Sequence, residues 1–224
     1  VWEAMKKEMV LRAYEISSPI QSIYFGGGSP SLLNPKSIEE LWDLINLHFT
    51  LEPLVEVTLE VNPDDVSESY LIELKKVGIN RLSLGVQSFL DRDLTLMNRV
   101  HKSKQARTAL ELISKNFSNY SLDLIYGMPY SSLTDWEQTI ETALSFNPPH
   151  ISAYALTVEE KTALFYQVKK EEVLLLPEEA VEEQYQLMVQ KLEGLGYINY
   201  EFSNFGKPEF FSVNNQNYCR GKPY

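Results

Sequence analysis

Short apolar runs recur along the chain about every 30 residues, and segments with helical spacing of apolar residues separate them. Such runs, bounded by glycine, proline or polar residues, predict β-strands. The predicted strands are residues 20–25, 55–60, 81–86, 121–125 and 150–156. The predicted helices are residues 1–16, 35–49, 67–78, 91–97, 103–115, 134–145 and 178–195. Strands that alternate with helices pair in parallel, so the pattern predicts an α/β fold with a parallel sheet.

Capping residues set several of the predicted helix ends. Asn34 precedes Pro35 as an N-cap, Ser67 begins the next helix, and Thr134 with Glu137 has the spacing of a capping box. The helix over residues 1–16 has Trp2, Met5, Met9 and Tyr14 near helical spacing, which predicts an amphipathic helix. Residues 197–202 are predicted as a last strand, followed by a polar, irregular tail.

Polar or glycine residues follow each of the predicted strands. The carboxyl ends of parallel strands meet on one face, so Glu60, Gln87, Asp123 and the loop Gly26–Gly28 are expected to converge there. Taken singly, each carboxylate is as often a helix cap or a surface group as a functional residue. Together with Arg99 in a following loop they suit a ligand that carries an ammonium, a carboxylate and ribose hydroxyls. That describes an amino acid joined to a nucleoside.

The three consecutive glycines expose backbone N–H groups, which a ligand can approach closely. Residues Gly28-Ser29-Pro30-Ser31 match neither a P-loop nor a dinucleotide-binding loop, so phosphate is a poor candidate ligand. A tight turn that binds nothing is the alternative.

Length and composition narrow the class of protein. The 224 residues suit one α/β domain, or one domain and part of a second. A net charge of −11 disfavours a nucleic-acid partner, because phosphate binding depends on Lys and Arg. The single cysteine, Cys219, excludes an internal disulfide and favours a cytoplasmic location. The sequence has no apolar run long enough for a membrane span and no signal peptide at its start.

Five motifs, in order, resemble the radical S-adenosylmethionine (SAM) enzymes of the oxygen-independent coproporphyrinogen III oxidase type. They begin at Gly26, Glu60, Gly85, Arg99 and Asp123, and read GGGSPS, EVNP, GVQSF, RVH and DLIYGMP. The segments that begin at His150 (HISAYALT) and Tyr200 (YEFSNF) resemble the haem-chaperone branch of this family. The resemblance covers almost the whole chain.

The resemblance implies a partial (β/α)6 barrel of the TIM-like, radical SAM type, here without its first strand and cluster loop. Residues 1–160 would form the barrel, and residues 161–224 would start a C-terminal region of helices and strands. Gly27, Gly28 and Ser29 would hold the methionine end of SAM. The other expected cofactor-binding residues are Glu60, Gln87, Arg99 and Asp123, with Ile125 and Thr157 beside the adenosine. No residue is assigned a catalytic or metal-binding role.

The sequence also departs from the family. The family binds a 4Fe-4S cluster through a Cys-x-x-x-Cys-x-x-Cys loop, and this chain has only Cys219. We expect that loop to lie outside the chain, and a relative without a cluster is the alternative. Asn214 and Cys219 replace a His and a Trp of the haem-chaperone branch, which weakens the case for haem there. Cys219 is either a thiolate ligand of haem or a small buried apolar group.

The three histidines are weaker candidates. We expect His48 to pack or cap, and His150, which opens a strand, to be structural. His101 lies in a loop beside Arg99, so either a ligand role or plain surface is expected.

The resemblance favours haem trafficking, with SAM, a 4Fe-4S cluster and haem as cofactors and a haem-acceptor protein as partner. The alternative is the oxidase proper, which removes hydrogen from a propionate side chain and decarboxylates it to a vinyl group. An aldolase-like barrel is disfavoured, because no lysine lies at a strand end where it would form a Schiff base.

Overall fold

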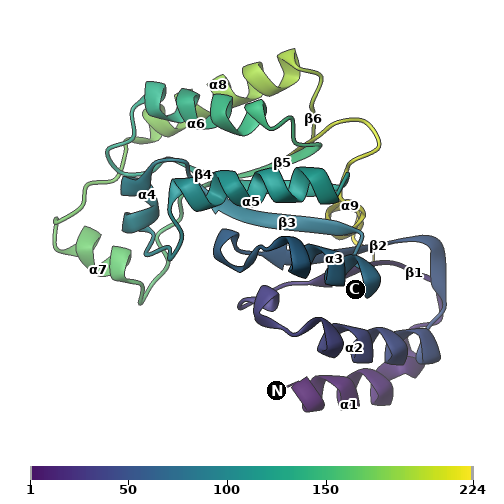
Figure 1. The fold of residues 1–224 in the computed structure, drawn as a ribbon. Coiled ribbons are helices and arrows are strands. Elements are labelled where there is room, and N and C mark those ends of the chain that lie inside the picture. Colours follow the sequence, from purple (N-terminus) through teal and green to yellow (C-terminus); the bar gives the residue numbers. More distant parts are fainter. Residues whose placement is uncertain (1, 223–224) are drawn as a thin grey trace.

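The computed structural model describes residues 2–222, and a seven-stranded, curled sheet runs through them (Figure 1). The strands lie in the order β1-β2-β3-β4-β5-β7-β6. They are β1 (Ile20–Phe25), β2 (Leu51–Val61), β3 (Arg81–Gln87), β4 (Tyr120–Tyr126), β5 (His150–Ala155), β6 (Ile198–Glu201) and β7 (Asn204–Gly206). Strands β1 to β5 are parallel, and β7 and β6 complete the sheet in antiparallel pairs. The predicted α/β partial barrel is confirmed.

Helices cover the outer, convex face of the sheet in Figure 1. The α-helices are α1 (Trp2–Arg12), α2 (Pro35–His48), α3 (Glu68–Lys76), α4 (Asp91–Leu96), α5 (Ser103–Asn116), α6 (Leu133–Ser145), α7 (Ala163–Lys169), α8 (Glu178–Gly194) and α9 (Val213–Cys219). Short 3-10 helices are η1 (Ala13–Glu15), η2 (Pro30–Leu32) and η3 (Pro63–Asp65). Within residues 2–222, no helix has the length and hydropathy needed to cross a membrane.

The two faces of the sheet differ in chemistry. Side chains alternate between faces along a strand, and the outward positions, such as Leu59, Leu84 and Leu122, are fully buried and apolar. Each such leucine contributes about 1.5–3 kcal/mol through burial. The inward positions are polar instead: Glu56, Thr58 and Glu60 on β2, Arg81 and Ser83 on β3, Ser121 and Asp123 on β4, and His150 and Ser152 on β5. The barrel interior is therefore a polar chamber.

Two helix starts agree with the sequence prediction and one does not. Asn34 accepts a hydrogen bond from the N–H of Lys36, and Ser67 accepts one from Tyr70. The capping box predicted at Thr134 is wrong, because Ser132 is the N-cap of α6. The Asp135 carboxylate accepts the backbone N–H of Ser132 at 2.9 Å, which closes the box two residues earlier.

Helix α1 ends at Arg12, before the predicted end at residue 16, and it lacks the buried face that an amphipathic helix normally has. None of its residues is buried, and Met5 and, beyond its end, Tyr14 are exposed. The helix packs against α2, and Lys6 Nζ donates to Glu40 Oε2 of that helix at 3.3 Å. Its place at the margin of the molecule explains the lack of burial.

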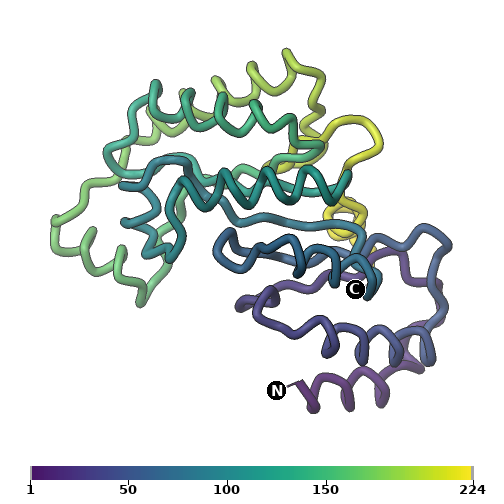
Figure 2. The backbone as a smooth tube through the Cα atoms, viewed as in Figure 1, coloured from purple at the N-terminus to yellow at the C-terminus, as the bar shows by residue number. Residues whose placement is uncertain are grey.

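The end of the chain is more ordered than predicted. The tail after residue 202 contains β7 and α9, and α7 also lies outside the predicted helices. Figure 2 shows the yellow end of the chain returning to the first strand, and Lys222 Nζ donates to Gln21 Oε1 at 2.9 Å. A domain boundary at residue 160 stays a prediction, although β6 and β7 extend the same sheet. The prediction for β2 was also short, since the strand begins at Leu51.

Candidate functional site

A cavity of about 300 Å³ lies on the polar inner face of the sheet. Five parallel strands and α9 supply its walls, so residues far apart in the sequence meet there. The lining residues are Tyr24, Glu60, Arg81, Ser83, Gln87, Asp123, Ser152, Tyr154 and Asn215. Three residues predicted from strand ends, Glu60, Gln87 and Asp123, are thus brought together.

Glu60 anchors the glycine loop. Tyr24 Oη donates to Glu60 Oε1 at 2.9 Å, and the N–H of Gly27 donates to Oε2 at 3.1 Å. A Cβ on Gly26 would lie 2.7 Å from the Tyr24 ring and 2.9 Å from Glu60 Oε1. A side chain at residue 26 would therefore displace the Tyr24 ring, the Glu60 carboxylate or both.

Gly27 and Gly28 are needed for a different reason. Their φ angles are +79° and +65°, a left-handed conformation that favours glycine, and a Cβ on either would meet nothing within 4 Å. The space beside them is therefore open to a ligand. The N–H of Gly27 is already bonded to Glu60, however, so the expectation of a free N–H at this residue was wrong. Ser29 follows in an exposed position.

Gly26→Ala is expected to lower the free energy of unfolding by about 1–3 kcal/mol, as overpacking of a tight site does. Thermal denaturation measures the change, and the Tyr24 to Glu60 hydrogen bond should be lost. Gly194→Ala is the matched control, because a Cβ there has open space and an alanine favours the helix. Equal stability of the Gly26→Ala protein and the parent would contradict the close contact.

Asp123 lies deeper in the cavity. Ser83 Oγ donates to both of its carboxylate oxygens, at 3.1 and 2.9 Å, and Ser121 Oγ donates to Oδ1 at 3.1 Å. Burial raises the pKa of Asp123 to about 6, and the serine hydroxyls oppose that rise. The carboxylate is therefore mostly ionised at neutral pH and becomes protonated as the pH falls through about 6.

Gln87 ends β3 in an unusual conformation. Its φ is +66°, and the pairing of β3 with β4 shifts register between Leu84 and Gln87. The bulge turns the Gln87 side chain back over Gly85, where a Cβ would lie 3.0 Å from Nε2. The amide is thus held against the cavity wall.

The remaining predicted residues lie around this cavity rather than in its lining. Arg99 is half-buried, and its Nη1 is 3.5 Å from Asn62 Oδ1. Partial burial lowers the pKa of Arg99, while the carboxylates of Asp123 and Asp64 act in the opposite direction. Ile125 is two residues beyond Asp123 on β4, and so shares its face of the sheet. Thr157 is exposed in the loop after β5.

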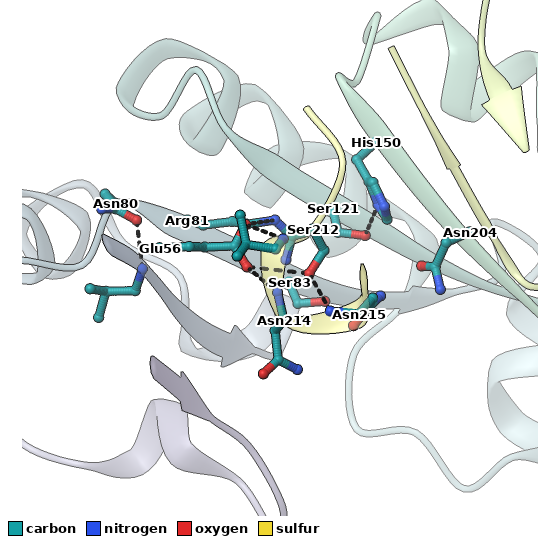
Figure 3. A network of polar contacts seen from close by, with 12 residues as sticks. Glu56, Asn80, Arg81, Ser83, Ser121, His150, Asn204, Ser212, Asn214 and Asn215 are labelled. Carbon is teal, nitrogen blue, oxygen red and sulfur yellow. Dashed lines mark hydrogen bonds and ion pairs between the residues drawn. The ribbon is translucent and has the colours of Figure 1, made fainter. Parts of the chain in front are cut away.

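A buried charge cluster joins β2 and β3 to the start of α9 (Figure 3). Glu56 accepts the backbone N–H groups of Val213 at 3.0 Å and Asn214 at 3.2 Å, together with the Ser212 hydroxyl at 3.3 Å. Arg81 Nε lies 3.8 Å from Glu56 Oε2, and both side chains are almost fully buried. The cluster fixes α9 across the inner face and brings Asn215 into the cavity wall.

The structure shows how far two of the histidines and the cysteine are buried. His150 is fully buried in β5, which agrees with a structural residue. His101 is also buried and its Nε2 lies 3.2 Å from the carbonyl of Val86, so the expectation of a surface loop there was wrong. Cys219 is exposed, which corrects the expectation of a buried apolar group. Asn214 directs its amide away from the cluster in Figure 3.

Five cavity-lining residues were not predicted from the sequence, although the pattern of polar and apolar positions could have indicated them: Tyr24, Arg81, Ser83, Ser152 and Tyr154. Each occupies an inward position of a strand whose outward neighbours are apolar. A parallel sheet covered on both faces reads as a continuous apolar run, so this alternation indicates a polar interior. Asn215 had no local signal, because only the return of α9 brings it to the cavity.

Comparison with known proteins identifies the class. The model of the Radical SAM superfamily matches residues 3–143, which is more than half of the chain, so this protein belongs to that superfamily. A solved structure described as coproporphyrinogen III oxidase (HemN) from Escherichia coli, a radical SAM enzyme, superposes with a TM-score of 0.79 at 24% identity. It covers 98% of this chain and 50% of that one, and shows the shared fold.

Several curated relatives narrow the resemblance from the superfamily to one branch of it. "Heme chaperone HemW" of Bacillus subtilis is 38% identical over 99% of this chain and 59% of its own length. "Heme chaperone HemW" of Escherichia coli is 33% identical over 95% of this chain and 55% of its own. The chain therefore spans about half the length of the curated relatives it matches. The resemblance to the haem-chaperone branch is confirmed.

The superfamily implies SAM and a 4Fe-4S cluster, and the residues present fit the first of these. Carboxylates and an amide line one cavity, and the glycine loop lies beside it through its hydrogen bond to Glu60. A nucleoside with an amino-acid end needs such hydrogen-bonding partners. The cluster does not fit this chain's own residues, because one cysteine cannot supply three thiolates. No group of three potential metal ligands occurs within residues 2–222 either.

Proposed function

We propose that this chain forms the SAM-binding part of a haem chaperone of the radical SAM superfamily. The observation that carries the proposal is the convergence of Glu60, Gln87 and Asp123 on one cavity beside the Gly26–Gly28 loop. The relatives named heme chaperones support the choice of haem trafficking over the oxidase.

Each residue has a distinct task in this proposal. The Glu60 carboxylate, held by Tyr24 and Gly27, would accept hydrogen bonds from the ammonium or hydroxyls of SAM. Asp123 would accept the ribose hydroxyls, and the Gln87 amide would serve as donor and acceptor. Arg99 would pair with the SAM carboxylate, and Ile125 would contact the adenine. Bound with its cluster, SAM supplies radical chemistry in this superfamily, and the chain's own residues supply binding and orientation.

The haem, the cluster and the haem-receiving protein belong to the proposal as well. The cluster cysteines would lie on a segment other than residues 2–222. We place the protein in the cytoplasm, where an exposed free thiol such as Cys219 stays reduced.

A longer form of the protein tests this function. With a Cys-x-x-x-Cys-x-x-Cys segment ahead of residue 1, anaerobic reconstitution is expected to give roughly four irons per chain. The same protein should bind haem and should not convert coproporphyrinogen III into its vinyl product with SAM and reductant. Iron-free protein with all three cysteines present would contradict the cluster, and the vinyl product would favour the oxidase.

Arg99→Ala is expected to weaken SAM binding by about 1.5–3 kcal/mol, the range for a hydrogen bond to a charged group. Isothermal titration calorimetry with the reconstituted protein measures the change. Arg99→Lys should recover only part of the affinity, because a point charge does not reproduce the planar guanidinium. Unchanged affinity in the Arg99→Ala protein would remove Arg99 from the site, and thermal denaturation of both variants controls for folding.

A further inference from the structure

A row of hydrogen bonds leaves the cavity at Asp123 and ends at the base of α9. Ser121 Oγ is 3.1 Å from Asp123 Oδ1 and 2.8 Å from His150 Nδ1. His150 Nε2 is 2.7 Å from Tyr200 Oη, and the N–H of Ser212 donates to Tyr200 Oη at 3.2 Å. The row joins β4, β5, β6 and the residue that caps α9.

The groups at the two ends of this row decide which atom donates and which accepts in each hydrogen bond. A backbone N–H only donates, so Tyr200 Oη accepts from Ser212 and its own hydrogen is free for His150 Nε2. Burial, together with the charge of Arg81, lowers the pKa of His150 well below its ordinary value, so the ring is neutral. A neutral imidazole carries one N–H, and if Nε2 accepts, that hydrogen is on Nδ1.

The same logic directs the hydroxyl of Ser121. A protonated Nδ1 donates to Ser121 Oγ and cannot accept from it. Ser152 Oγ is 3.0 Å from Ser121 Oγ and donates to Asn204 Oδ1 at 2.6 Å. Of the acceptors left for the Ser121 hydrogen, the Asp123 carboxylate is the stronger, because it is charged.

We propose that Tyr200 is a positioning residue for the cofactor cavity: its hydroxyl holds His150 in the Nδ1–H tautomer, which turns the Ser121 hydroxyl toward Asp123. The role of Asp123 toward SAM rests on the proposed function, whereas the tautomer and the Ser121 hydrogen bond do not. Tyr200 does not itself line the cavity, but it contacts Asn215, which does, so the tests below follow His150 and Asp123 directly.

Other charged and titratable groups also act on His150 and Asp123, and all of them except Tyr200 stay in place in the tests below. Arg81 and Tyr200 face His150. The titratable and charged groups that face Asp123 are Tyr24, Glu60, Arg81, Arg99 and Tyr154.

The first test is ¹⁵N NMR of the ¹⁵N-histidine-labelled 224-residue chain without ligand. His150 is expected to show a protonated Nδ1 and an unprotonated Nε2. In Tyr200→Phe the Nε2–H tautomer should appear, because nothing then donates to Nε2. Tyr197→Phe is the control, since Tyr197 is a buried tyrosine bonded to the carbonyl of Pro148 and lies outside the row. A protonated Nε2 in the parent chain overturns the proposal without any variant.

The second test follows Asp123 through its carboxyl ¹³C signal as pH changes. Tyr200→Phe and His150→Gln should raise its titration midpoint by about 0.5–1 unit, because a donor to the carboxylate is lost. His150→Asn retains an N–H near the Nδ1 position and should leave the midpoint close to that of the parent. Equal midpoints in all three variants would refute the proposal. If the midpoints shift but SAM affinity does not, the relay stands and the assignment of Asp123 to SAM fails.

Discussion

Glu56→Ala is expected to lower the free energy of unfolding by about 3–5 kcal/mol, because it leaves the buried Arg81 guanidinium without its counter-charge. The variant also removes the acceptor for the N–H groups of Val213 and Asn214, so α9 should detach from the inner face. Chemical denaturation measures the loss. Hydrogen exchange at residues 213–219 should rise more than exchange in β3.

A double variant separates the buried charge from side-chain packing. Glu56→Met combined with Arg81→Met removes both charges and should recover much of the stability, as buried ion pairs replaced by apolar groups often do. Glu111→Ala, at an exposed position on α5, is the control and should change stability by less than about 0.5 kcal/mol. A Glu56→Ala protein as stable as this control would contradict the role of Glu56 in holding α9 on the inner face.

Asp123→Asn is expected to stabilise the protein above pH 6 while weakening SAM binding. The pKa of Asp123 is about 6 in the folded chain and about 3.9 in an unfolded one, so the folded state binds more protons between these values. Stability from this group is therefore highest below pH 4 and falls as pH rises to 6. The full difference corresponds to roughly 3 kcal/mol, and we expect about 1–2 kcal/mol because the side chain faces the cavity and keeps some access to water.

Thermal denaturation at pH 4 and pH 7.5 tests the sign of this effect. The Asp123→Asn protein should gain stability over the parent only at the higher pH. Ser83→Ala should do the opposite at pH 7.5, because it removes the hydroxyl that donates to both carboxylate oxygens. A pH-independent difference between Asp123→Asn and the parent would contradict the raised pKa.

Much of the fold follows from local sequence. Residues 81–86 and 121–125 are short apolar runs between turn signals, and the structure has strands there. Parallel pairing then brings strand ends together, which is why Glu60 and Gln87 could be placed at one cavity in advance. Asp123 lies in the middle of β4 and reaches the cavity because its side chain faces inward. Their distances in the sequence did not matter, because the alternation of strands and helices decides the pairing.

Other features depend on contacts that no local pattern reveals. Helix α9 has seven residues and no buried side chain, and its position comes from Glu56, far away in the sequence. Asn215 enters the cavity only for that reason. The start of α6 depended on which of two possible capping boxes forms, Thr134 with Glu137 or Ser132 with Asp135, and Asp135 also pairs with Arg92 of α4 at 2.6 Å.

The hydrogen bonds between Glu56 and the start of α9 can form only late in the synthesis of this domain. Glu56 and Val213 are 157 positions apart, so the last wall of the cavity forms only after residue 213 has been synthesised. Until then the interior stays open to water and the Glu56 carboxylate is solvated. Contacts this distant are slow to form, because a long loop must close first. Nascent chains that stop before residue 213 should therefore have an assembled sheet and no closed ligand chamber.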